Sequence, residues 1–155
     1  MQDRLDIGAY QHDGRLIILG SSTTPEWTVI HEMPPEILAD TASDEALGQA
    51  VLAAANRCRG TVNEPASIAD ETAKQLGFKS WADKQKKPVY ASVSRRHGAD
   101  HLDILPVRKA NKSGTTLVFT ETAFKAPIAE PEKIGATLRE ALKLSAEWKN
   151  LPPLK

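Results

Sequence analysis

The four histidines are the side chains of this sequence best suited to chemistry near neutral pH. They stand at His12, His31, His97 and His101. His97 and His101 form an H-x-x-x-H pair, a spacing that on a helix would present both imidazoles to one zinc ion. Gly98 and Asp100 between them favour a turn, and residues four apart on a strand are separated by about 13 Å. We therefore predict no metal site.

Other catalytic arrangements are equally weak in the sequence. A metal-free nuclease would need an acid, a base and a cation, which the histidines and the lysines of 84–87 could supply. The histidines are scattered over expected turns and strand ends, so this stays a rival interpretation. Cys58 falls on the apolar stripe of an expected helix, where a thiol is inert. Since no glycine-rich phosphate loop occurs either, we predict no catalytic residue and no cofactor.

Composition limits the class of protein. The chain has 155 residues, 41% of them hydrophobic, with 20 Lys and Arg against 20 Asp and Glu. This length predicts a single domain, and the balanced charge disfavours a nucleic acid partner. Runs of 18 apolar residues and a signal-peptide core are both absent from the sequence, and there is one cysteine. We therefore expect no membrane contact, no internal disulfide and a cytoplasmic location.

The first third of the chain is expected to form an antiparallel sheet followed by a helix. Runs rich in Ile, Leu, Val, Trp and Tyr at 4–10, 15–20 and 27–32 predict strands, and Asp13-Gly14 suits a tight hairpin turn. Pro34-Pro35 is expected to stop strand pairing. Ser43 predicts a helix start, and Gly60 predicts its end. The apolar stripe of this helix should face the sheet, and it comprises Leu47, Val51, Ala54 and Cys58.

The remainder predicts a short helix and then a second unit of strands and a helix. Ser67 is expected to cap the short helix, which ends at Gly77, and 78–87 is expected to be irregular. Strands are predicted within 89–93, 102–107 and 115–119. A final helix should have Pro131 in its first turn and end before Pro152-Pro153.

The two long helices match when they are offset by 87 residues, so that Gly48 aligns with Gly135. A glycine inside a helix costs about 1 kcal/mol relative to alanine, which predicts close packing at both positions. Either the halves 1–60 and 88–150 are an internal repeat joined by 61–87, or two amphipathic helices match by chance. In both cases the sequence predicts an α+β domain, an antiparallel or mixed sheet with its helices packed on one side.

Surface chemistry concentrates in the segment from Asn63 to Lys87. It combines carboxylates and lysines with one large apolar residue, Trp81. Such a segment is either a solvated charged face or a contact surface on which the tryptophan anchors a partner.

A family resemblance rests on the spacing of apolar residues and glycines. The stretch from Ser43 to Ala55, Leu76-Gly77-Phe78-Lys79-Ser80, Ile104-Leu105-Pro106 and the Ile134-Gly135 helix ending in Ala141-Leu142 resemble the immunity proteins of contact-dependent growth inhibition. The resemblance covers most of the chain and brings no active-site motif.

The resemblance implies a bacterial cytoplasmic protein, not an enzyme. It would bind the C-terminal toxin domain of a cognate effector as a 1:1 heterodimer and occlude the toxin's active site. Such toxins are commonly nucleases, including tRNA-cleaving ones, and a basic toxin would favour an acidic contact face. The candidate toxin-binding residues are Glu64, Asp70, Glu71, Trp81 and Asp83. The rivals that remain are a small metal-free hydrolase and a homo-oligomeric structural protein whose glycine-bearing helices pair between chains.

Overall fold

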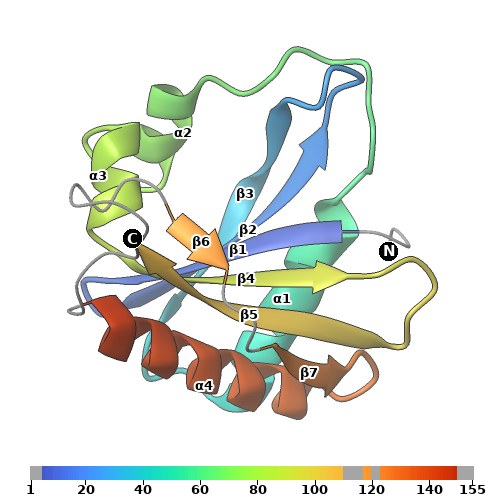
Figure 1. Cartoon of the computed structure of the whole chain (residues 1–155), viewed down its shortest axis with the longest axis vertical. Coiled ribbons are helices and arrows are strands. Elements are labelled where there is room, and N and C mark those ends of the chain that lie inside the picture. The colour runs from blue at the N-terminus through green and yellow to red at the C-terminus, as the bar shows by residue number, and fades with distance from the viewer. Residues whose placement is uncertain (1–4, 110–116, 120–122, 150–155) are drawn as a thin grey trace.

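The computed structural model of the chain describes residues 5–109, 117–119 and 123–149 (Figure 1). Its fold is α+β with an antiparallel sheet, as predicted. The strands are β1 (Leu5–His12), β2 (Arg15–Thr23), β3 (Val29–Ala39), β4 (Val89–Arg95), β5 (His101–Lys109), β6 (Leu117–Phe119) and β7 (Phe124–Pro127). The helices are α1 (Asp44–Arg57), α2 (Ala69–Gln75), α3 (Trp81–Lys86) and α4 (Pro131–Lys149).

The strand order is β3-β2-β1-β4-β5-β6, with β7 pairing beside β5. The first and second strands form the predicted hairpin. Asp13 and Gly14 both have positive φ, 51° and 71°, as a two-residue turn requires, and His12 lies opposite Arg15. Strand β7 was not predicted from the sequence. The start of the predicted 115–119 strand and the Pro152-Pro153 stop lie outside the described residues.

The prediction that Pro34-Pro35 ends strand pairing is wrong. Strand β3 continues through both prolines, and its register on β2 shifts between Ile18, which faces Glu36, and Gly20, which faces Glu32. The prolines therefore stand in a bulge of a strand at the sheet edge. A residue in such a position need not donate a ladder hydrogen bond, so proline is tolerated.

Helices α1 and α4 pack on one face of the sheet and enclose the main core (Figure 1). Helix α1 begins as predicted, because the Ser43 hydroxyl accepts a hydrogen bond from the Ala46 N–H at 3.1 Å. Its predicted stripe is buried, Cys58 included, and the sheet and α4 supply the opposing side chains. These include Ile7, Leu16, Ile18, Val93, Ile104, Ile134 and Leu138.

The two glycines meet where these helices pack together. A Cβ on Gly48 would lie 1.8 Å from the Pro131 carbonyl oxygen, and a Cβ on Gly135 would lie 1.8 Å from the Asp44 carbonyl oxygen. Only glycine therefore fits at either position. The packing role predicted for both glycines is confirmed, and the close neighbour is the other helix.

Helices α2 and α3 lie on the opposite face, over β1 and β2, where a second core holds Tyr10, Ile17, Leu19, Ala73, Leu76 and Phe78. The prediction that the helices pack on one side of the sheet therefore holds for α1 and α4 and is wrong for α2 and α3. Two local predictions are wrong here. Residues 81–86 are helical, because the Ser80 hydroxyl accepts the Asp83 N–H at 3.2 Å and caps α3. Ser67 does not cap α2; its hydroxyl accepts the backbone N–H of His31 at 2.8 Å.

In the part of the chain that the structure describes, no helix combines the length and the apolar character that crossing a bilayer requires.

Candidate functional site

The described residues cover the sheet face that carries α2 and α3 only in part. Strand residues that point to this face include Asp6, Ser92 and Ser94, whereas their neighbours on each strand enter the main core. Two adjoining hollows remain, and Asp6 lines both. We call them the Lys84 pocket and the arginine hollow.

The Lys84 pocket lies between α3 and the middle of the sheet and has a volume of about 470 Å³. Strands β1, β2, β3 and β4 supply its floor and one wall, and α3 supplies the other wall. Its lining includes Tyr10, His31, Trp81, Lys84, Tyr90 and Ser92.

Lys84 is buried, with 5% of its surface exposed. Its Nζ lies 4.3 Å from the centre of the Tyr10 ring and 4.0 Å from that of the Trp81 ring, so two aromatic faces hold the ammonium. Burial lowers the pKa of Lys84 from 10.5 to about 8. The side chain therefore remains a cation at neutral pH.

His31 stands beside this cation on β3. Its ring centre is 5.5 Å from that of Trp81, and its Nδ1 is buried without a hydrogen-bond partner. Burial, followed by the charge of Lys84, lowers the pKa of His31 to about 4. The imidazole is therefore neutral at physiological pH and leaves Lys84 as the positive group of this wall.

Tyr10 and Tyr90 pair on the floor, with ring centres 4.9 Å apart. Burial raises the pKa of Tyr10 well above its usual value and raises that of Tyr90 to about 12. Both phenols therefore keep their protons and can donate hydrogen bonds. An ammonium and hydroxyl donors around one pocket suit the binding of an anionic oxygen group.

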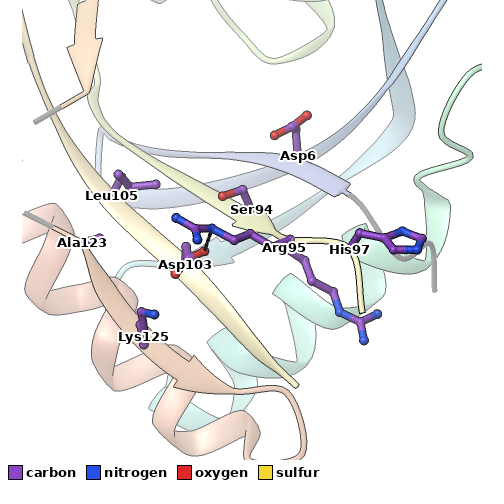
Figure 2. Close-up of a pocket in the computed structure, with 9 residues that line it drawn as sticks. Asp6, Ser94, Arg95, His97, Asp103, Leu105, Ala123 and Lys125 are labelled. Atoms are coloured by element: carbon purple, nitrogen blue, oxygen red, sulfur yellow. Dashed lines mark ion pairs between the residues drawn. The ribbon is translucent and has the colours of Figure 1, made fainter. Parts of the chain in front are cut away.

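The arginine hollow lies over β4, β5 and β7 and has a volume of about 450 Å³ (Figure 2). Its charges are mixed. The Arg96 Nε is 3.7 Å from the Asp103 Oδ2, and the Arg95 Nε donates to the Ala99 carbonyl at 2.7 Å. Lys125 and Asp6 complete the charged lining. A protein partner could form ion pairs with these charged side chains in place of the pairs within the chain.

The histidines lie in different parts of the fold. His12 ends β1, with its ring 5.1 Å from that of Phe78, and His31 is in the Lys84 pocket. His97 stands in the predicted turn, where Gly98 has a φ of 73°, and His101 begins β5. Within the described ranges, no group of three or more His, Cys, Asp or Glu side chains could hold a metal ion.

Three of the predicted toxin-binding residues come together at the α2–α3 junction. The Asp70 carboxylate accepts the backbone N–H of Trp81 at 2.8 Å. Asp83 lies two residues further along α3, with its carboxylate 3.6 Å from the Lys87 ammonium. Glu71 is exposed on α2. Trp81 is half-buried against Lys84 and His31, so only part of its surface is open to a partner.

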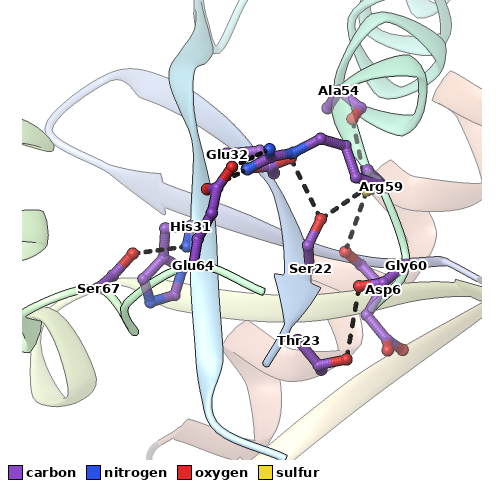
Figure 3. Close-up of polar contacts among 11 residues, drawn as sticks. Asp6, Ser22, Thr23, His31, Glu32, Ala54, Arg59, Gly60, Glu64 and Ser67 are labelled. Carbon is purple, nitrogen blue, oxygen red and sulfur yellow. Dashed lines mark hydrogen bonds and ion pairs between the residues drawn. The ribbon is translucent and has the colours of Figure 1, made fainter. Parts of the chain in front are cut away.

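Glu64 belongs to a separate network (Figure 3). The Arg59 guanidinium bridges Glu64, at 2.6 Å, and the buried Glu32, at 2.8 Å, while the Ser22 hydroxyl accepts the Arg59 N–H. Arg59 lowers the pKa of Glu64. This network connects the segment after α1 to β2 and β3. The Glu64 carboxylate is therefore already paired with Arg59 within the chain.

Sequence reasoning missed three exposed apolar residues, one of which lines the Lys84 pocket. Trp27 is 81% exposed at the tip of the β2–β3 hairpin, Val29 is 44% exposed and lines the pocket, and Ile68 is 61% exposed. The Ser67 N–H donates to the Val29 carbonyl, which brings Ile68 to the same edge. We call these three residues the apolar rim. The signal available was Trp27 itself, in a turn-rich stretch between two strands.

Comparison with known proteins places the fold. No protein-family model and no curated protein matches the chain. A protein of unknown function from Neisseria meningitidis has the same fold, with a TM-score of 0.69 at 22% identity over 91% of this chain and 94% of that one. So does a chain of the CdiA-CT/CdiI toxin and immunity complex from Yersinia pseudotuberculosis, with a TM-score of 0.64 at 16% identity over 90% and 96%.

Proposed function

We propose that this chain is an immunity protein that binds the C-terminal toxin domain of a contact-dependent growth inhibition effector and occludes its active site. The observation that carries the proposal is the shared fold, along nearly the whole of both chains, with a chain of a toxin and immunity complex. The toxin that we expect is a nuclease, and the complex that we expect is a 1:1 heterodimer in the cytoplasm.

The uncovered sheet face supports binding of a protein. An exposed Trp27 with Val29 and Ile68 beside it provides apolar area of the kind that anchors interfaces. The Lys84 pocket and the carboxylates of the α2–α3 pair, Glu71 and Asp83 among them, surround this area with polar groups. A stable interface of standard size buries about 800 Å² on each partner.

Neutralisation of a toxin by occlusion requires complementary shape and charge and no bond chemistry. The perturbed groups of the Lys84 pocket suit this role: a neutral His31 and two protonated tyrosines are set to hold hydrogen bonds. The histidine-based hydrolase remains the rival, and hydrolysis of RNA by the isolated chain would favour it.

Co-purification tests the proposal directly. The tagged chain is expressed together with the toxin domain encoded beside its gene and, as a control, with a toxin domain from an unrelated effector. We expect the cognate domain alone to elute with the chain as a 1:1 complex and to lose its toxicity. A cognate domain that stays unbound and toxic would contradict the proposal.

The contribution of the α2–α3 pair is tested with a Trp81→Ala and Asp83→Ala double variant. We expect it to bind the toxin domain at least about tenfold more weakly, because an aromatic anchor and a charged neighbour are both lost. Glu140→Ala, an exposed change on α4, is the control and should bind normally. Unchanged affinity of a folded double variant would exclude this surface.

A further inference from the structure

Three charged side chains are buried among the described residues, and two of them are neutralised. Glu32 pairs with Arg59, and Asp103 lies near Arg96 and His101. The third is Lys84. Among the described residues no carboxylate forms an ion pair with its ammonium, which contacts the rings of Tyr10 and Trp81. Asp6 lines the same pocket without forming an ion pair to it. An ammonium that is buried without a counter-ion is energetically unfavourable, and binding of an anion would stabilise it.

The ammonium faces a space that an incoming group can enter. The pocket volume of about 470 Å³ greatly exceeds the roughly 30 Å³ that a water molecule occupies, so a whole side chain fits. Tyr10, Tyr90 and Ser92 line the same space and carry hydroxyl donors. An oxygen acid that reaches Lys84 would therefore meet one full positive charge and neutral donors.

The charge of the pocket selects the kind of anion. A phosphate carries nearly two negative charges and is usually held by several cations or a guanidinium fork. The Lys84 pocket provides one ammonium, and Asp6 adds a negative charge to its lining. This balance matches a single carboxylate.

The surroundings of the pocket select the source of the carboxylate. Val29 lines the pocket and belongs to the apolar rim with Trp27 and Ile68, which a small free acid would leave exposed. A protein that covers the rim would bring its own side chains over the opening.

We propose that the Lys84 pocket receives the carboxylate of one Asp or Glu side chain of the protein partner. This inference rests on the proposed function, because the partner that it describes is the toxin domain. A partner carboxylate in the pocket would complete the ion pair that the free chain lacks, and it would fix the register of the complex.

The test compares Lys84→Met with Lys86→Met in binding to the cognate toxin domain, measured by calorimetry. Methionine keeps the length of the side chain and removes its charge, and Lys86 is an exposed lysine of the same helix. We expect Lys84→Met to weaken binding more than about tenfold and Lys86→Met to change it less than about twofold. Equal affinity of wild type and Lys84→Met would overturn the inference and leave the proposed function standing, whereas absence of wild-type binding would overturn both.

Two further arms identify the source of the carboxylate. In a double-mutant cycle, changing one acidic residue of the toxin domain to alanine should weaken binding to the wild-type chain. The same change should have no effect on binding to Lys84→Met. Acetate added to the free chain should leave the NMR signals of the Lys84 side chain unchanged at millimolar concentration. Saturable binding of acetate in that range, with no coupled acidic residue on the toxin domain, would overturn the assignment to a protein side chain.

Discussion

At the scale of single residues, Lys84 is the most informative side chain of the molecule. Two aromatic faces compensate its burial in part, yet a pKa near 8 shows that the protein environment still disfavours the charge. Binding sites commonly contain a buried charged group that destabilises the free protein, because the ligand then supplies the opposite charge.

The cost of this charge predicts a stability effect. The pKa of Lys84 is 10.5 unfolded and about 8 folded, which corresponds to about 3 kcal/mol of destabilisation at pH 7. Loss of the ring contacts offsets about 1–2 kcal/mol of this, so Lys84→Met should raise the free energy of unfolding by about 1–2 kcal/mol. Urea unfolding at pH 7 measures the difference.

The pH dependence gives a second readout of the same variant. Between pH 8 and pH 10.5 the unfolded chain holds the Lys84 proton that the folded chain has lost, so wild-type stability rises relative to Lys84→Met. The groups that face Lys84 are His31, Tyr10, Tyr90 and Asp6, and they are present in both proteins. A stability difference that stays constant from pH 7 to pH 10 would contradict the burial of the charge.

Sequence analysis identified Trp81 but not the role of Lys84. The two are neighbours only because residues 81–86 form a helix, on which residues three apart share a face. They become a pocket wall only because α3 packs over Tyr10 of β1, a contact across more than seventy residues of chain. Such a contact has no local signature, whereas the hairpin turn at Asp13-Gly14 and the Ser43 cap are local and were predicted correctly.

At the scale of elements, the α1–α4 contact is the feature most sensitive to substitution. Gly48→Ala or Gly135→Ala would place a methyl group against a backbone carbonyl that cannot move without shifting a helix. We expect each variant to lose about 2 kcal/mol or more, although alanine is the better helix former by about 1 kcal/mol. Gln49→Ala, exposed on the same helix, is the control and should change stability by less than about 0.5 kcal/mol. Thermal unfolding that leaves both glycine variants as stable as wild type would contradict the close packing.

The predictions of where helices and strands begin or end were wrong at residues whose contacts are with an element distant in the sequence. Pro34-Pro35 indicated the end of a strand, but the edge position of β3 and its bulge allow the strand to continue. Ser67 indicated a helix cap, but its hydroxyl serves the backbone of β3. In both cases the competing contact depends on sheet order, which the local pattern does not contain.

At the scale of the whole molecule, α2 and α3 pack on the second face of the sheet. They lie over β1 and β2, and among the described residues no helix covers the arginine hollow over β4, β5 and β7. The reciprocal contacts of Gly48 and Gly135, 87 residues apart, support the proposal that the chain is an internal repeat with an inserted segment 61–87. In this proposal the segment 61–87 gives the two halves different outer surfaces, which a protein partner could distinguish.

Hydrogen exchange of the chain with and without the cognate toxin domain tests most directly whether this face binds. We predict slower exchange in the complex at the tip of the β2–β3 hairpin and along α3, with no change on the solvent side of α4, which lies across the sheet. Protection confined to α1 and α4, or none at all, would contradict the assignment of the uncovered face as the toxin-binding surface.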